Sequence, residues 1–393
     1  MNASALRELI PTDVLRTKLD GVFERALEQQ RIVGGVVVVM QDGQELYASA
    51  AGLADREARL PMREDTVFRL ASITKPIVTV AALRLVERGQ LELDAPITRY
   101  LPSFKPALAD GSAPGISVRQ LLTHTSGLSY GFSQALDGPY RKAGVSDGID
   151  APGLSFDEEL RRIVSAGLSR APGSAWEYSL SLDVLGAVLE RVCAKPLPEV
   201  IEALVTQPLG MTHTTFVAKP NQPLATPYVD GAPPERMREG HRIPFVGESG
   251  LWFSPARAFE PTSFPSGGAG MIGTAREVTR LLELVRSGGG PLLERATTQS
   301  MHTNQTGNLP ILMGPGWGFG YGGAVLLDPR AASSPQSPGT WCWGGVYGHS
   351  WFVDPALRLV VVGLTNTAIE GMLGRFPTEL RDAVYAAAAE RSR

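Results

Sequence analysis

The sequence has few of the residues that build disulfide frameworks and metal sites. Only two of its 393 residues are cysteine, Cys193 and Cys342, and they lie far apart in the chain. Two cysteines cannot form a disulfide framework, so we expect ordinary thiols. The five histidines show no metal-ligand spacing, and none pairs locally with an acid. We therefore expect no metal and no cofactor, and we interpret His124 and His349 as structural hydrogen-bonding groups.

An excess of one charge and a long apolar run are also absent. The chain has 37 Lys and Arg against 40 Asp and Glu, a net charge of −3, which excludes the basic surface typical of nucleic-acid binding. Residues 1–23 carry charges every few positions, and no segment approaches the roughly 18 apolar residues of a membrane span. The sequence predicts a cytoplasmic protein with no nucleic-acid or membrane partner. It leaves the oligomeric state open.

Glycine and proline are abundant, at 43 and 30 residues, which indicates many turn-rich connections. Strand signals nevertheless gather at the two ends of the chain. Near the start, residues 34–52 predict a β-hairpin that turns at Asp42-Gly43. Near the end, three further runs predict strands, at 339–348, 350–354 and 357–367.

Helical periodicity covers the two ends and much of the middle. It predicts helices over 12–30, over 182–192 and at the C-terminus over about 375–391. It also predicts a buried helix that ends near Gly89, and a further helix that begins with a capping box of Thr274 and Glu277. We therefore expect an α+β (or α/β) fold, in which one antiparallel sheet forms from both termini, is flanked by helices, and carries an inserted, mainly helical lobe. The predicted division is an α/β subdomain (1–70 and 267–393) and a helical subdomain (71–266) within a single catalytic unit.

Ser146 lies in the one G-x-S-x-G of the chain, the pattern of a nucleophile elbow. An elbow needs a buried strand before the serine and a helix after it. Residues 137–143 do not resemble such a strand, and the sequence after Gly148 breaks a helix. We interpret Ser146 as a member of a glycine-rich surface loop and not as a catalytic residue.

Ser72 and Lys75 form an S-x-x-K at the start of the buried helix in "FRLASITKPIVTVAALRL". Residues three apart share a helix face, so the Lys75 amine can reach the Ser72 hydroxyl. The helix N-terminus and burial both disfavour a charged ammonium, which suits Lys75 to act as a base. The backbone N–H of Ser72 also points outward at the helix start, where it can help to hold an oxyanion.

Several segments, in this order, make the chain resemble the serine β-lactamase and penicillin-binding-protein superfamily. They are "FRLASITKPI", "LLTHTSGL", "PGSAWEYSLSLDVLG", "SGGAGMIGTAREV", "GPGWGFGYG" and "WGGVYGHSWFVD". More narrowly, the sequence is similar to the family VIII carboxylesterases, which have the fold of class C β-lactamases. The resemblance covers nearly the whole chain and implies a β-lactamase-like fold.

The resemblance also implies a set of site residues. Ser72 would be the nucleophile, Lys75 and Tyr178 the base system, and the backbone N–H groups of Ser72 and Val346 the oxyanion hole. Trp343-Gly344-Gly345 stands where β-lactamases have K-T-G, so these residues would line the substrate pocket. Without the resemblance, Trp341 and Trp343 would be interpreted as core residues on one strand face. Tyr130 is a further candidate for the pocket.

Two departures from the family pattern favour an esterase. Leu180 replaces the asparagine of Y-x-N, and Trp343 replaces the lysine that in β-lactamases helps to bind a substrate carboxylate. An apolar indole suits a neutral ester better than an anion. We expect a serine carboxylesterase that hydrolyses short-chain esters, including acetyl esters such as the acetoxy group of cephalosporins, through an acyl-enzyme on Ser72. The alternatives are β-lactamase or DD-peptidase activity, acyl transfer to another alcohol, and a non-enzymatic penicillin-binding-like protein.

Overall fold

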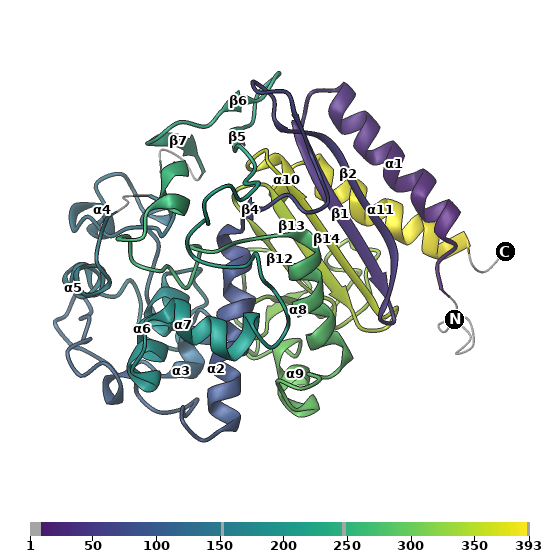
Figure 1. Cartoon of the computed structure of the whole chain (residues 1–393). Coiled ribbons are helices and arrows are strands. Elements are labelled where there is room, and N and C mark those ends of the chain that lie inside the picture. The colour runs from purple at the N-terminus through teal and green to yellow at the C-terminus, as the bar shows by residue number, and fades with distance from the viewer. Residues whose placement is uncertain (1–8, 151–152, 246–248, 391–393) are drawn as a thin grey trace.

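The computed structural model describes residues 9–150, 153–245 and 249–390. Its centre is an antiparallel eight-stranded sheet with the order β10-β11-β12-β13-β14-β1-β2-β3 (Figure 1). The strands are β1 (Gly34–Gln41), β2 (Gln44–Asp55), β3 (Leu60–Pro61), β10 (Trp317–Phe319), β11 (Ala324–Leu326), β12 (Trp341–Gly345), β13 (His349–Asp354) and β14 (Leu359–Thr365). Because β1 pairs with both β2 and β14, the expected antiparallel sheet of both chain ends is confirmed.

The unbroken apolar run of β1 reflects its central place in this sheet. Val36 and Val38 pack in the core on one face, whereas Val37 and Val39 pack in the core on the other face. A strand that is buried on both faces has no polar side to alternate with the apolar one. The sheet is therefore the middle layer of three.

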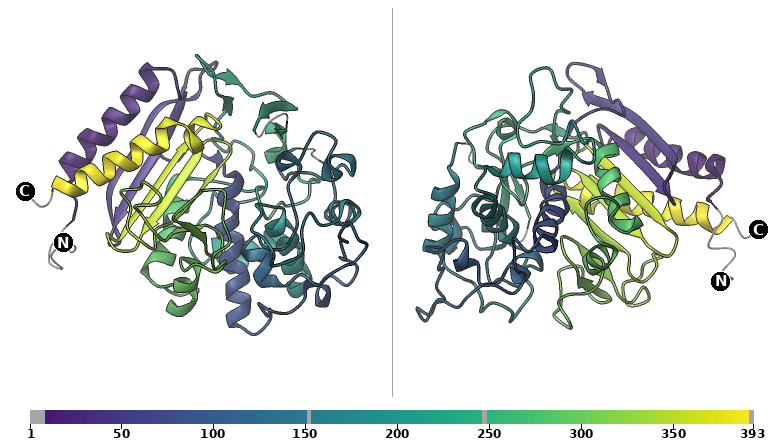
Figure 2. Two further views of the ribbon diagram at one scale, coloured as in Figure 1. Left: turned by 180° about the vertical axis from the view of Figure 1, so that it is seen from behind. Right: turned by 60° about the horizontal axis from the view of Figure 1, so that its bottom comes forward.

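The helices form the two outer layers. Helices α1 (Thr12–Glu28) and α11 (Arg375–Ala389) lie side by side over one face of the sheet, and the remaining larger helices lie on the other side (Figures 1 and 2). These are α2 (Thr74–Glu87), α3 (Val118–Leu122), α4 (Pro139–Lys142), α5 (Phe156–Ala166), α6 (Ser181–Cys193), α7 (Leu197–Ile201), α8 (Ala275–Ser287) and α9 (Arg295–Met301); the short α10 (Glu370–Leu373) precedes α11. The predicted terminal helices are present, although position 391 lies outside the described residues.

The stretch between β3 and α8 is less purely helical than the sequence predicts. It contributes to three two-stranded sheets, which are β4 (Phe68–Arg69) with β9 (Ile272–Gly273), β5 (Tyr228–Val229) with β6 (Glu235–Arg236), and β7 (His241–Pro244) with β8 (Gly250–Phe253). Strands of two to four residues are too short to show a periodic pattern. The division of the chain into two subdomains stays a prediction. Among the described residues, no helix is both long and apolar enough to cross a membrane.

Candidate active site

Ser72 lies in a single 3₁₀ turn, Ala71–Ile73, that leads directly into α2. Both Ser72 and Lys75 are buried, with exposed fractions of 7% and 1%. The Lys75 Nζ donates to Ser72 Oγ at 3.2 Å and to the carbonyl of Gly268 at 2.8 Å. Ala71 has a φ of 45°, an uncommon conformation for a residue with a side chain, and such strain is typical of functional sites. The structure thus brings the two residues of the S-x-x-K into contact.

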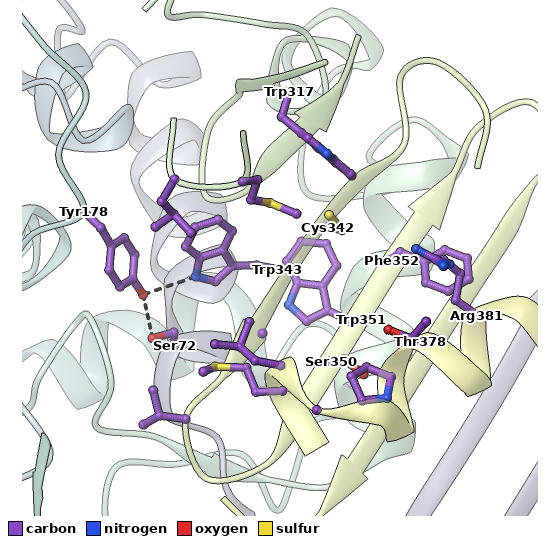
Figure 3. Close-up of a pocket in the computed structure, with 18 of the residues that line it drawn as sticks. Ser72, Tyr178, Trp317, Cys342, Trp343, Ser350, Trp351, Phe352, Thr378 and Arg381 are labelled. Atoms are coloured by element: carbon purple, nitrogen blue, oxygen red, sulfur yellow. Dashed lines mark hydrogen bonds between the residues drawn. The ribbon is translucent and has the colours of Figure 1, made fainter. Parts of the chain in front are cut away.

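Tyr178 approaches the same serine from the segment just before α6 (Figure 3). Its hydroxyl donates to Ser72 Oγ at 2.6 Å, and the indole Nε1 of Trp343 donates to the Tyr178 oxygen at 3.2 Å. The Lys75 Nζ lies 4.6 Å from the centre of the Tyr178 ring. One hydrogen-bonded chain around the Ser72 oxygen therefore joins Ser72 and Lys75 to Tyr178 and Trp343, which are distant from them in sequence.

A histidine and serine network supports Tyr178 from behind. The Nδ1 of His124 accepts from the backbone N–H of Ser179 at 3.3 Å, and the two rings of His124 and Tyr178 lie 4.9 Å apart. Burial, with a smaller effect of the Lys75 charge, lowers the pKa of His124 well below its ordinary value, so the ring is neutral. The Nε2–H of His349 donates to the carbonyl of Arg69 at 2.7 Å. Both structural roles predicted for these histidines are confirmed.

The loop that holds Lys75 is fixed by a buried carboxylate. An oxygen of Asp183 accepts from the Ser266 hydroxyl and, at 3.2 Å, from the N–H of Gly268. A Cβ on Gly268 would lie 2.4 Å from the other Asp183 oxygen, so a side chain there would displace the carbonyl that Lys75 binds. Burial raises the pKa of Asp183. The sequence does not reveal these supports; their one signal is the glycine-rich "SGGAG" segment, which is typical of close backbone approach.

The Ser72 hydroxyl opens into a cavity of about 740 Å³. Trp343, Gly344 and Val346 line this cavity, in agreement with their predicted places. Most of the remaining wall near Ser72 is apolar: Phe132, Trp176, Phe245, Pro310, Leu312, Met313 and Trp317. A cavity of this size falls within the usual range of small-molecule sites, about 300–1,000 Å³.

Two predicted pocket residues do not line the cavity. Tyr130 is covered by Phe132, whose ring stacks on it at 4.5 Å, so Phe132 takes the place at the wall. Gly345 faces the backbone just before Ser72, because a Cβ there would lie 2.6 Å from the carbonyl of Leu70. Tyr130 and Gly345 thus lie behind the cavity wall, and their predicted part in the substrate pocket stays a prediction.

Ser146 lies in a loop after α4, but the loop is not on the surface as predicted. The residue is 1% exposed, its hydroxyl donates to Asp150 Oδ1 at 2.5 Å, and its N–H donates to Glu159 Oε2 at 3.1 Å. The surface-loop interpretation is wrong because these carboxylates hold the loop inward. Ser146 does not line the cavity of Ser72, and the element before it is a four-residue helix instead of a strand.

The cysteines are both free. Cys342 contributes to the cavity wall, and burial raises the pKa of its thiol to about 12, so it stays protonated at neutral pH. No group of three or more His, Cys, Asp or Glu within the described ranges could hold a metal ion.

Comparison with known families agrees with this fold and site. The family described as Beta-lactamase matches residues 19–385, and the chain therefore belongs to that family. The sequence is 55% identical over 375 residues to Esterase EstB from Burkholderia gladioli, covering 95% of each protein. It is 28% identical to a lovastatin esterase from Penicillium rubens, covering 89% of this chain and 93% of that protein.

Solved structures give the same picture. The structure of EstCE1, described as a hydrolase with promiscuous acyltransferase activity, superposes with a TM-score of 0.91 at 46% sequence identity. The superposition covers 95% of this chain and 99% of the EstCE1 chain. The β-lactamase-like fold expected from the sequence is thereby confirmed.

Proposed function

We propose that this protein is a serine carboxylesterase that hydrolyses short-chain carboxylic esters through an acyl-enzyme on Ser72. The observation that carries the proposal is the pair of hydrogen bonds at Ser72 Oγ, one from Lys75 Nζ and one from the Tyr178 hydroxyl. A serine hydroxyl becomes a nucleophile when adjacent groups can take its proton. The similarity to Esterase EstB, whose name states an esterase, supports the same class of reaction.

The proposed reaction has two halves. Ser72 Oγ attacks the ester carbonyl while Tyr178 and Lys75 share the transfer of its proton, and the N–H groups of Ser72 and Val346 stabilise the oxyanion. The proton is then passed to the oxygen of the leaving alcohol, and the bond between that oxygen and the acyl carbon breaks. The alcohol departs, and the acyl group stays on Ser72. Water attacks that acyl group in the second half, with the same residues taking its proton, and the acid departs.

The charges around the cavity favour an ester over an anionic β-lactam or a peptide C-terminus. Among the described residues that line the cavity, Arg381 is the one cation. Lys75 donates to Ser72 Oγ but is not part of the lining. The Arg381 guanidinium is already paired with Asp382 at 2.8 Å. Trp343 stands at the position of the β-lactamase lysine. Its indole N–H already donates to the Tyr178 hydroxyl oxygen and is not free for a substrate carboxylate. A substrate carboxylate would thus be desolvated without a free partner cation.

Hydrolysis of p-nitrophenyl butyrate by the wild type and by Ser72→Ala tests the proposal. We expect the wild type to turn over and Ser72→Ala to lose about 10³-fold or more in kcat, because the nucleophile is removed. Ser146→Ala is the matched control and should keep its kcat, since Ser146 lies outside the cavity. An active Ser72→Ala would overturn the assignment. An inactive wild type that opens a chromogenic cephalosporin would favour the β-lactamase alternative.

A further inference from the structure

The cavity at Ser72 does not end at the active-site face of the sheet. Trp343 is opposite Trp351, and Gly344 is opposite Ser350, so neighbouring positions on β12 face opposite sides of the sheet. The cavity is lined on the Ser72 side by Trp343 and on the other side by Gly344, Ser350 and Phe352. It therefore reaches both faces of β12.

The cavity passes round β12 where this strand lacks a neighbour. Strand β11 pairs with β12 only at Trp341 and Cys342, so the last three residues of β12 are paired with β13 alone among the described strands. At Gly344 the side chain of Met372 from α10 packs where a Cβ would lie, 2.7 Å away, and Met372 forms part of the cavity wall. On the far face, the cavity becomes a groove between β12–β13 and helices α10–α11, which we call the β12 groove. It is lined by Cys342, Ser350, Phe352, Leu373, Thr378 and Arg381.

The position of Tyr178 indicates which part of an ester points toward the β12 groove. The leaving alcohol oxygen must lie near the Tyr178 hydroxyl to receive a proton. That hydroxyl accepts from the Trp343 indole, and Trp343 lines the same cavity as the groove residues Ser350 and Thr378. Figure 3 shows Ser72, Tyr178 and the Trp343 indole on one side of the view and Ser350 and Thr378 on the other. The group attached to the leaving oxygen is therefore beside Trp343, where the cavity turns round the strand edge.

We propose that the β12 groove is the subsite for the alcohol part of the substrate, and that it takes a large, apolar, uncharged alcohol. This inference rests on the proposed esterase function. Leu373 and Phe352 supply apolar walls, and the charge of Arg381 is neutralised by Asp382, so an anionic group is not required. The short acyl group stays in the cleft at Ser72, and the alcohol sets the specificity.

A series of alkyl acetates tests the proposal, because the acyl group stays constant while the alcohol grows. Each methylene that the groove buries should raise kcat/KM up to about fourfold. We expect hexyl acetate to exceed ethyl acetate by about 30-fold or more in kcat/KM. Thr378→Trp, at an exposed position on α11, fills the groove. It should lower kcat/KM for hexyl acetate about tenfold and leave ethyl acetate within about twofold.

The controls distinguish an effect on the group that binds in the β12 groove from a general loss of esterase activity. Ala386→Trp places the same side chain on an exposed part of α11 outside the cavity and should change neither acetate. The ratio of p-nitrophenyl hexanoate to p-nitrophenyl acetate turnover should be the same in Thr378→Trp and wild type. A selective loss of hexanoate would assign the groove to the acyl chain, and equal effects on both alkyl acetates would also overturn the proposal. A wild type inactive on every ester would instead contradict the esterase function.

Discussion

At the scale of single residues, Trp343 combines two effects that a lysine at this position could not. Its indole presents an apolar face to the cavity, and its N–H donates to the Tyr178 oxygen at 3.2 Å. The two rings lie 5.1 Å apart, so the indole also fixes the tilt of the phenol. In the proposed mechanism, Trp343 therefore acts through Tyr178 as a positioning residue for proton transfer, and it also lines the cavity.

Trp343→Phe separates the hydrogen bond from the apolar wall. The phenyl ring keeps an aromatic surface but has no N–H, so Tyr178 loses one donor. A neutral hydrogen bond contributes about 0.5–1.5 kcal/mol, and we expect kcat for p-nitrophenyl butyrate to fall about 3–10-fold. KM should change less than kcat if the bond acts on proton transfer. An unchanged kcat with a raised KM would restrict Trp343 to substrate binding.

The sequence predicted the contacts of the active site that depend on spacing or on a family motif. Ser72 and Lys75 are three apart at a helix start, so their contact follows from helix geometry. Tyr178 and Trp343 were placed by motifs. The support from Asp183 through Gly268 was missed, because it joins residues 85 positions apart and carries no local pattern. The sequence did not reveal that Phe132, and not the stacked Tyr130, reaches the cavity wall, because no local pattern distinguishes two neighbouring rings.

At the scale of elements, helix α5 and the loop before it hold a buried acidic cluster. Glu159 on α5 accepts from the N–H of Ser146, and Asp147 accepts from the N–H of Gly131 at 2.7 Å and pairs with Arg141 at 2.8 Å. Burial raises the pKa of Asp147 to about 7 and that of Glu159 to about 9, and neighbouring carboxylates add to both shifts. Gly131 lies next to the cavity residue Phe132, so the cluster fixes one wall of the site.

Glu159→Gln should make the protein less sensitive to alkaline pH. The folded pKa of about 9 lies above the ordinary 4.5, so the folded state keeps a proton that the unfolded chain releases. Folding stability is therefore lost as pH rises from about 4.5 to about 9. We expect Glu159→Gln to be more stable than wild type by about 1 kcal/mol or more at pH 8.5, and this gain to shrink toward pH 5.

Urea unfolding at several pH values measures this difference. Glu158→Gln is the matched control on the same helix, because the Glu158 pKa is lowered by its hydrogen bond to Arg162. Removing that carboxylate should give no gain at alkaline pH. A Glu159→Gln protein whose stability depends on pH in the same way as wild type would show that Glu159 is ionised in the folded state.

The elements themselves were predictable where the apolar pattern is long. The hairpin of β1 and β2, helices α1 and α11, and strands β12 to β14 all appear where periodicity or turn residues indicate them. Strands β10 and β11 were not predicted, because each has three residues within a glycine-rich segment. Their pairing depends on the neighbouring strand β12, which local sequence does not reveal.

At the scale of the whole molecule, α1 and α11 close the face of the sheet that lies away from Ser72. The rings of Phe23 on α1 and Phe376 on α11 lie 5.6 Å apart, and both are buried in the same cluster as Val37 and Val39 of β1. None of these side chains lines the cavity. These four side chains therefore contribute to stability away from the cavity, whereas another part of α11, with Thr378 and Arg381, lines it.

Phe23→Ala should uncouple these two properties. Removing a buried ring costs about 3–5 kcal/mol, since the cavity left behind fills only in part. We expect a lower urea midpoint for Phe23→Ala, whereas kcat per folded molecule for p-nitrophenyl butyrate stays within about twofold of wild type. A large loss of kcat at full folding would show that the outer layer also shapes the site.

The pairing of β1 with β14 also determines when the protein becomes active during synthesis. The ribosome makes Ser72, Lys75 and Tyr178 well before β12, which carries Trp343 and precedes Val346. The hairpin of β1 and β2 joins the rest of the sheet only through β14, which is synthesised after the other strands of that sheet. A nascent chain thus carries its nucleophile without its oxyanion donor or its indole. The proposed site is therefore complete only once β12 and β14 have been synthesised and paired.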